Sequence, residues 1–480
     1  MTVLSRFTDW LLLNKKLGIL FVFLFAFCIR MAGLGRNDIC MDEPFSIWLS
    51  QYQPFEILSI CLSGNNMPLF EWLMFPYLKL TGFSNPFMMR LPSVLFSAAC
   101  ITIWYFIFLK ENKITSAIAS VFVLLLAQPL QLLAHEFRCY SLFYLLCTLQ
   151  IMFTIELVRK KKSAKLFVAA GMINGLLIFT HYLAFFSLAT QFIILLVFLR
   201  KEAIKHLLFV FLPAIVLLCP FLFQMLGRIA QSDQFTWVPA LTWKVLYGSV
   251  VSFMNGWITL LCFAVGAAFT FIKNKSIRLS DLHVVLLFFF LVPLLGMLLF
   301  SLKSPIITPR YLGFLMIPGL VFFVTLPDSG RGSQIPTFVA ILFMLSQFNH
   351  APWSGRSPDE FVAFAKSQKK KNENIYLYPG YRNLEFAWYW NREFFSTPDS
   401  INALLEKDGV YAIHQYEDLK DHAWGQSSFL LCEADVEGNM PAYSLHVMVR
   451  KERIKTSSAY FPHTYYVTRF ISPHGGKSNP

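Results

Sequence analysis

The sequence predicts an all-α polytopic membrane protein with a small α/β domain at its C-terminal end. Three observations predict this class. Of the 480 residues, 56% are hydrophobic and only 14% are charged, which is not the composition of an ordinary soluble domain. Long apolar runs fill the first 350 positions, and basic residues gather in alternate loops between them. We therefore expect a transmembrane domain over residues 1–350 and a separate domain over 351–480.

The apolar runs are about 17 to 25 residues long, enough for a helix to cross a hydrocarbon core of roughly 30 Å. They cover residues 17–34, 92–109, 115–134, 139–158, 165–180, 182–199, 207–226, 248–272, 282–302, 309–326 and 335–349. About eleven transmembrane helices are therefore expected. Basic residues precede the first run and no small-residue cleavage site follows it, so we expect a retained anchor and not a signal peptide.

The basic residues orient these helices. The formal charge of +13 lies wholly before residue 351, because 15 basic and 15 acidic residues balance after it. The basic clusters are Arg6, Lys15 and Lys16; Lys110 and Lys113; Arg159, Lys160, Lys161, Lys162 and Lys165; Arg200, Lys201 and Lys205; Lys273, Lys275 and Arg278; and Arg331. By the positive-inside rule these loops and the N-terminus face the cytoplasm, and an odd number of spans places the C-terminal domain outside. Charge spread in this way indicates topology and not nucleic-acid binding.

The first outer loop, residues 35–90, combines acidic and amphipathic features. An adjacent acidic pair, Asp42 and Glu43, follows the first span in "CMDEPFSIW". Apolar residues then recur at three- and four-residue spacing over 54–61 and 69–80, which predicts short amphipathic helices lying in the membrane interface. The alternative is a re-entrant hairpin that packs on the helix bundle.

Further ionisable residues are expected at the same membrane face. They are His135, Glu136, Arg138, His181, Lys303 and Arg310, with Tyr182 beside them. Ionisable groups at the ends of apolar helices are functional candidates, although arginines at span ends also serve as interfacial anchors. The sequence contains no GxGxxG or GxxxxGK[ST] phosphate loop, so we expect any donor to be membrane-borne and not a nucleotide.

The segment after residue 350 predicts a small α/β domain outside the membrane. Three aromatic-rich strands, "NIYLYP", "GVYAIHQY" and "YSLHVMVR", alternate with helical stretches at 357–371 and 399–408. We expect this domain to close over a site on the outer face or to guide an acceptor.

Several stretches match, in order, the motifs of a known family. "DEPFS" resembles the acidic signature of the GT-C membrane glycosyltransferases, in the bacterial branch related to protein O-mannosyltransferases and the lipid A aminoarabinose transferase. "NMPLFEWLMFPYLKLTGFSNPFMMRLPSVLFS", "HEFRCYSLFYLL", "THYLAFFSLATQF" and "PRYLGFLMIPGL" resemble further motifs of that branch, and together the matches cover residues 30–325. The sequence departs at "NNMPLF", where the family more often has a His before two prolines.

The resemblance implies a GT-C-like fold and transfer of a hexose or pentose from a polyprenyl-phosphate carrier to an acceptor outside the cytoplasm. The acceptor could be a lipid, a glycan or a protein. The implied location is the bacterial inner membrane, with the C-terminal domain in the periplasm. The family suggests inversion by a single displacement, with Asp42 as the general base and Glu43 positioning it. A base is needed because an alcohol is a poor nucleophile, and an adjacent like charge raises the pKa of one carboxylate.

The departing lipid phosphate requires fixed cations. Arg310 and Arg138 are the candidates, because a guanidinium fork suits phosphate oxygens. Lys79 and Arg90 could also attract the carrier phosphate, although snorkelling at the interface explains both equally well. The candidate lining residues are Glu136, Tyr140, His181, Tyr182 and Tyr311. The sequence identifies no certain cofactor, but carboxylates of Asp42 and Glu136 could together bind a divalent cation.

Two other functions stay open. A flippase or transporter for lipid-linked sugars would share many spans, but it usually has helices broken by Gly or Pro and internal repeats. A polysaccharide polymerase or ligase would also use lipid-linked sugars and arginines on the outer face. The early acidic pair favours the monosaccharide transferase.

Overall fold

The computed structural model describes residues 14–64, 66–160, 164–199, 207–222, 227, 238–273, 279–329, 334–352, 356–415, 418–419, 428–434, 450–457 and 464–471. Two compact units make up the chain. The first contains residues up to 34 with 58–70 and 90–352, and the second contains 35–57, 71–89 and the residues from 353 onward.

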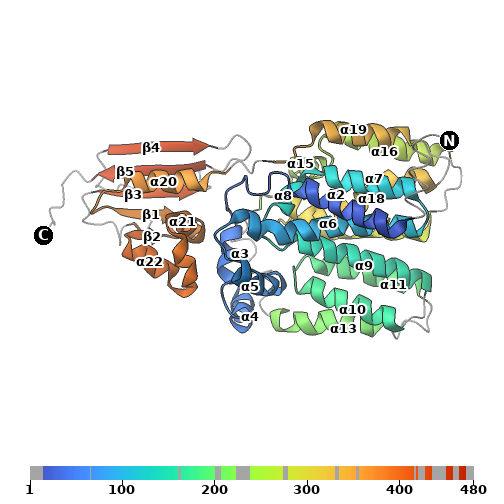
Figure 1. Cartoon of the computed structure of the whole chain (residues 1–480), viewed down its shortest axis with the longest axis horizontal. Coiled ribbons are helices and arrows are strands. Elements are labelled where there is room, and N and C mark those ends of the chain that lie inside the picture. The colour runs from blue at the N-terminus through green and yellow to red at the C-terminus, as the bar shows by residue number, and fades with distance from the viewer. Residues whose placement is uncertain are drawn as a thin grey trace. The chain divides into compact units, whose positions relative to one another are not determined.

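The first unit is a helix bundle, and a helix lies on every predicted apolar run (Figure 1). The helices are α2 (Lys15–Met31), α6 (Pro86–Lys110), α7 (Ile114–Leu126), α8 (Gln128–Ala134), α9 (Tyr140–Lys160), α10 (Ala164–Ile178), α11 (Ala184–Phe198), α13 (Leu207–Leu218) with η1 (Cys219–Phe221), α15 (Trp243–Phe253), α16 (Trp257–Lys273), α17 (Asp281–Ser301), α18 (Pro309–Thr325) with η3 (Leu326–Ser329), and α19 (Ile335–Gln347). Neighbours pack in pairs, among them α10 with α13, α16 with α19, and α17 with α18.

Two runs that were expected to be single helices are broken. α7 and α8 meet at an angle of 66°, and α15 and α16 meet at 80°. Among the described residues, α6, α9 and α17 are each long and apolar enough to cross a membrane, and each bent pair adds a further crossing if it forms one span. Several other apolar helices have only 10–17 residues. The total of about eleven spans stays a prediction.

The first break is stabilised by a buried arginine. Pro129 has no N–H for the carbonyl of Leu125, and the N–H of Gln128 donates to the side chain of Asn255 (3.0 Å) instead of to Leu124. Arg30 of α2, which is fully buried, donates to the carbonyls of Leu124 (2.7 Å) and Leu125 (3.2 Å). Its guanidinium therefore replaces the two helical donors that the break removes.

The second break supports the first. Asn255, between α15 and α16, has a left-handed backbone with φ 52°. Its side-chain amide donates to the carbonyls of Leu126 (2.7 Å) and Met344 (3.2 Å) and accepts from Gln128. One asparagine thus pairs backbone groups of three other helices, α7, α8 and α19, which would otherwise be left without partners in an apolar region.

We expect Asn255→Gly to destabilise the bundle by about 1–3 kcal/mol for each buried group left unpaired. Glycine tolerates the positive φ, so the substitution removes the hydrogen bonds without adding backbone strain. Asn112→Gly is the matched control, because Asn112 has φ 54° but is exposed and its side chain bonds only Lys15 among the contacts recorded for it. Thermal unfolding in detergent should show a lower midpoint for Asn255→Gly alone, and equal midpoints would contradict this account.

A buried polar network joins α9, α10 and α11. Gln150 donates to Asn174 (3.0 Å), Asn174 donates to Gln191 (2.7 Å), and Gln191 donates to Thr154 (2.8 Å). Ser187 donates to Gln150 (2.5 Å). The network fixes the register of the hairpin that carries His181.

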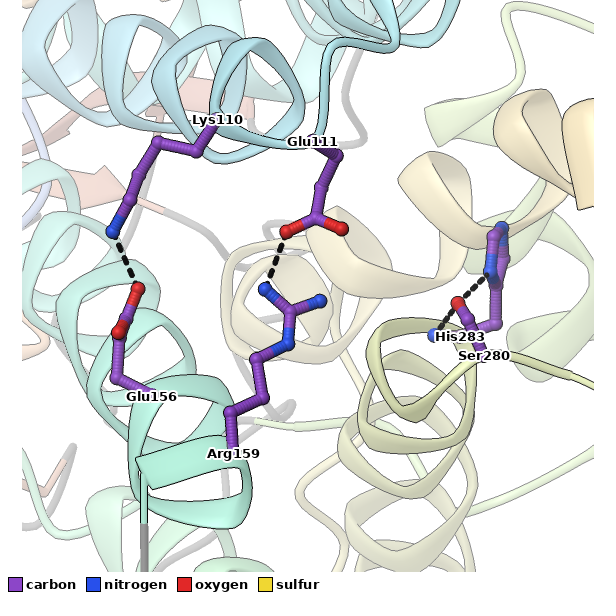
Figure 2. Close-up of polar contacts among 6 residues, drawn as sticks. All are labelled: Lys110, Glu111, Glu156, Arg159, Ser280 and His283. Atoms are coloured by element: carbon purple, nitrogen blue, oxygen red, sulfur yellow. Dashed lines mark hydrogen bonds and ion pairs between the residues drawn. The ribbon is translucent and has the colours of Figure 1, made fainter.

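Ion pairs join the C-terminal ends of α6 and α9, which are predicted to face the cytoplasm (Figure 2). Lys110 pairs with Glu156 (2.5 Å), and Arg159 pairs with Glu111. All four side chains are partly exposed, so we expect each pair to contribute at most about 1 kcal/mol. Figure 2 also shows Ser280, the N-cap of α17, whose hydroxyl lies 2.7 Å from Nδ1 of the buried His283.

The second unit contains a five-stranded sheet in the order β2-β1-β3-β5-β4. Its strands are β1 (Asn374–Tyr378), β2 (Val410–Ala412), β3 (Ser428–Ala434), β4 (Arg450–Ser457) and β5 (Thr464–Ile471). β1 is parallel to β2 and β3, and β5 is antiparallel to β3 and β4. Helices α20 (Pro358–Gln368), α21 (Asn383–Trp390) and α22 (Ile401–Lys407) accompany it, with short 3-10 turns η4 (Gly380–Arg382), η5 (Arg392–Ser396) and η6 (Pro398–Ser400).

The predicted helices at 357–371 and 399–408 correspond to α20 and α22, and two predicted strands correspond to β1 and β2. The third predicted strand, at 443–450, lies outside the described residues except for its last residue. The sequence did not predict α21, β3 or β5.

The first loop also folds into helices. α3 (Glu43–Leu49) begins at the acidic pair, and α4 (Pro54–Ser63) and α5 (Leu69–Thr81) lie where the two amphipathic helices were expected. α3 packs against α21 of the sheet domain within the second unit. The acidic motif therefore belongs to the same compact unit as the C-terminal sheet.

Candidate active site

The acidic pair lies at the start of α3, where its two members have different environments. Asp42 is the N-cap residue: its carbonyl accepts the N–H of Ser46 (3.2 Å), but its carboxylate makes no capping bond and is half-exposed. Glu43 is 3% exposed, and its carboxylate accepts the N–H of Cys40 (3.4 Å). Helix capping, the usual structural use of an aspartate here, does not account for the Asp42 carboxylate.

Two other buried carboxylates support this motif, and sequence reasoning missed both. Glu71 of α5 is 2% exposed and accepts the hydroxyl of Ser46 in α3 (2.8 Å). Glu385 of α21 accepts the N–H of Met41 (2.8 Å). An acidic residue in the apolar stretch "LFEWLMF" was a signal for Glu71, because buried carboxylates require partners. Glu385 lies 344 positions from Met41, so no local pattern could indicate it.

In the first unit, residues from three segments gather around His181, which lies between α10 and α11. The His181 ring centroid lies 5.8 Å from that of Tyr140 in α9 and 5.7 Å from that of Tyr311 in α18. The guanidinium carbon of Arg310 lies 5.8 Å from the centre of the Tyr140 ring. Arg138 donates to the side chain of Asn66 (3.3 Å) and lies close enough to His181 for its charge to act on that ring. These predicted residues therefore form one cluster of aromatic and cationic side chains.

His181 adds no positive charge to this cluster at neutral pH. Burial, and then the charge of Arg138, lower the pKa of His181 to about 3. The N–H of Leu183 donates to its Nδ1 (3.1 Å), so the neutral ring carries its proton on Nε2. The cations of the cluster are the arginines, and His181 offers an N–H donor.

Local structure fixes the start of α18, which carries Arg310. Pro309 opens the helix, a position that suits its fixed φ. The Tyr144 hydroxyl donates to the carbonyl of Arg310 (2.6 Å). Tyr144 fits there because residue 313 is a glycine: a Cβ on Gly313 would overlap the Tyr144 phenol.

We expect Gly313→Ala to destabilise the protein by about 1–3 kcal/mol, the usual cost of overpacking. Gly248→Ala is the matched control, because Gly248 also lies inside a helix but has open space around its Cβ position. There the gain in helix propensity should leave stability unchanged or slightly higher. Thermal unfolding in detergent separates the two variants, and a Gly313→Ala midpoint at or above the wild-type value would refute the packing argument.

The other predicted site residues differ in their burial and in their contacts. Lys79 lies over the Phe75 ring (4.2 Å), a contact that supports its reading as an interfacial anchor. Arg90 is only 1% exposed. Glu136, between α8 and α9, and Tyr182, between α10 and α11, are half-buried. Within the described parts of the chain, no group of three or more His, Cys, Asp or Glu residues could hold a metal ion. A cation bound by Asp42 and Glu136 stays a prediction, since they belong to different units.

Comparison with solved structures decides the fold. The chain aligns over 98% of its length with the whole of ArnT from Cupriavidus metallidurans bound to undecaprenyl phosphate, at 11% identity and a TM-score of 0.57. The apo state of the same ArnT aligns equally far, at 12% identity and 0.55. The chain has the GT-C fold.

The GT-C resemblance and the predicted fold class, a multi-pass helical protein with a small C-terminal sheet, are thereby confirmed. An oligosaccharyltransferase from Archaeoglobus fulgidus is more distant, with a TM-score of 0.45 at 10% identity over 80% of this chain and 64% of that one. No protein-family model and no curated protein sequence matches the chain.

Proposed function

We propose that this GT-C protein is a membrane glycosyltransferase that moves a sugar from a polyprenyl-phosphate donor to an acceptor on the extracytoplasmic face. The observation that carries the proposal is the cluster of Arg138, Tyr140, His181, Arg310 and Tyr311 in a chain with this fold. Two guanidinium groups with phenol and imidazole donors suit a phosphate dianion. The ArnT structure of the same fold is a complex with undecaprenyl phosphate.

The proposed reaction is a single displacement with inversion. The Asp42 carboxylate takes the proton of the acceptor hydroxyl as its oxygen forms a bond to the anomeric carbon. The bond between that carbon and the phosphate oxygen breaks, and the electron pair leaves with the lipid phosphate. Arg138 and Arg310 stabilise the negative charge that develops there. Glu43, through its bond to the Cys40 N–H, keeps the turn before Asp42 in place.

The bacterial inner membrane, with a cytoplasmic N-terminus and a periplasmic C-terminal domain, is the proposed location. The proposal rests on the distribution of basic loops. The acceptor is a lipid, glycan or protein with a reactive hydroxyl or phosphate, and the chain requires no nucleic acid. Residues 1–350 form the catalytic membrane domain in this scheme, and 351–480 form its outer domain.

The broken helices are the one observation that favours a flippase, because transporters often bind substrate at such breaks. Here, however, Arg30 and Asn255 bind the freed groups at Leu124, Leu125, Leu126 and Gln128. Backbone groups that are satisfied inside the protein are poorly placed to bind a substrate. The breaks therefore fit a structural role.

Purified protein in nanodiscs, supplied with a polyprenyl-phosphate sugar and candidate acceptors, tests the proposal. A transferase releases free polyprenyl phosphate and forms a product whose anomeric configuration is inverted. A flippase instead moves the intact lipid-linked sugar across liposomes without cleaving it. Cleavage with retention would remove the single-displacement mechanism, and transport without cleavage would remove the enzyme.

A further inference from the structure

Glu385 forms a buried hub in the second unit. It lies in α21, is 4% exposed, and accepts three hydrogen bonds from different parts of the chain. Its Oε2 accepts the N–H of Met41 (2.8 Å) and Nη1 of Arg382 (3.0 Å), and its Oε1 accepts the hydroxyl of Tyr465 in β5 (2.7 Å). A buried carboxylate with several charge-assisted bonds has a fixed position.

The residue that Glu385 holds has an unusual backbone conformation. Met41 has φ 58°, in the left-handed region that residues other than glycine rarely adopt. Such a conformation is strained and persists only where surrounding contacts impose it. Met41 is followed directly by Asp42, so its φ and ψ set the direction in which the chain enters α3.

The same domain also holds the rest of α3. The indole N–H of Trp48 donates to the carbonyl of Pro398 (3.0 Å). The hydroxyl of Tyr52, three residues after α3 ends, donates to the carboxylate of Asp399 (2.7 Å).

The Tyr465 hydroxyl is a reliable donor to Glu385. Burial, and then the charge of Glu385, raise the pKa of Tyr465 above its ordinary value, so its hydroxyl keeps the proton that it donates.

We propose that Glu385, oriented by Arg382 and Tyr465, is a positioning residue that holds Met41 in its left-handed conformation and thereby aims the Asp42 carboxylate. The inference rests on the proposed function, in which Asp42 is the base. It gives the C-terminal sheet domain an indirect part in catalysis, because this domain fixes the position of the acidic motif. A base must lie within hydrogen-bond reach of the proton it removes, and a misplacement of about 1 Å can cost 10²-fold in rate.

Glu385→Gln tests the proposal, because the side-chain amide is neutral and keeps only one acceptor oxygen, which weakens the charge-assisted bonds to this position. We expect kcat to fall by about 10- to 100-fold with the KM for the donor nearly unchanged. Hydrogen exchange at residues 38–49 should become about tenfold faster as the bond that holds Met41 weakens. Tyr465→Phe, which removes one donor to Glu385, should show smaller changes in the same direction.

Glu373→Gln is the matched control. Glu373 is 1% exposed, and it pairs with Arg469 of the same sheet (3.3 Å), but the bonds recorded for it do not involve the first loop. It should lower the melting temperature as Glu385→Gln does while leaving kcat and the exchange of 38–49 as in the wild type. If Glu385→Gln does not fold, the Tyr465→Phe result decides.

The two proposals fail separately. A wild-type protein that does not cleave the donor defeats the proposed function, whatever the exchange data show. An active wild type with Glu385→Gln and Tyr465→Phe variants that match Glu373→Gln in kcat and exchange overturns the positioning role alone.

Discussion

Asp42→Asn is expected to reduce turnover of a polyprenyl-phosphate sugar by about 10²- to 10⁴-fold, the contribution typical of a general base. The amide has nearly the same shape as the carboxylate, but it cannot accept a proton near neutral pH. Asp42 is half-exposed and the substitution is nearly isosteric, so expression should remain as in the wild type. The measurement is the release of free polyprenyl phosphate under single-turnover conditions.

Glu56→Gln is the control for Asp42→Asn. Glu56 lies in the same first loop, is exposed, and accepts only the backbone N–H of Gln53 among its recorded hydrogen bonds (2.9 Å). Its loss should not change turnover. Wild-type rates in Asp42→Asn would remove the assignment of the base, and an equal loss in both variants would indicate a general effect of loop charge.

The second large effect is expected at Arg310. Arg310→Lys keeps the charge but loses the planar fork that lies over the Tyr140 ring and that binds two phosphate oxygens in the proposed reaction. The lost charge-assisted bond should lower kcat/KM for the donor by about 10- to 100-fold, and Arg310→Ala should lower it further. Steady-state kinetics with varied donor concentration measure this change.

Arg392→Lys provides a matched comparison for Arg310→Lys. The Arg392 guanidinium lies 5.0 Å from the centre of the Trp388 ring, but Arg392 is exposed in the sheet domain. This variant loses a similar cation–π contact and should retain full activity. If Arg310→Lys also behaves as the wild type, Arg310 is an interfacial anchor and does not bind the donor.

The sequence by itself determined the helices of the membrane part. Each apolar run from 17–34 to 335–349 carries a helix, because an apolar segment of this length must satisfy its own backbone hydrogen bonds. The order of the spans also places the ends of α9 and α18 and the α10–α11 turn together, and so Tyr140, His181 and Tyr311 come into contact. Consecutive spans cross the membrane in opposite directions, so the start of every second span lies on the same side of the membrane. This part of the arrangement can therefore be predicted from the sequence.

Only the tertiary structure decided how the breaks and the acidic motif are held. Arg30 binds carbonyls 94 and 95 positions away, and Glu385 binds Met41 from 344 positions away. Such partners follow from packing between distant segments, because a freed backbone group must find whichever donor or acceptor the fold brings near it. Hydrophobic periodicity specifies which residues are buried, but it does not specify which buried polar group meets which.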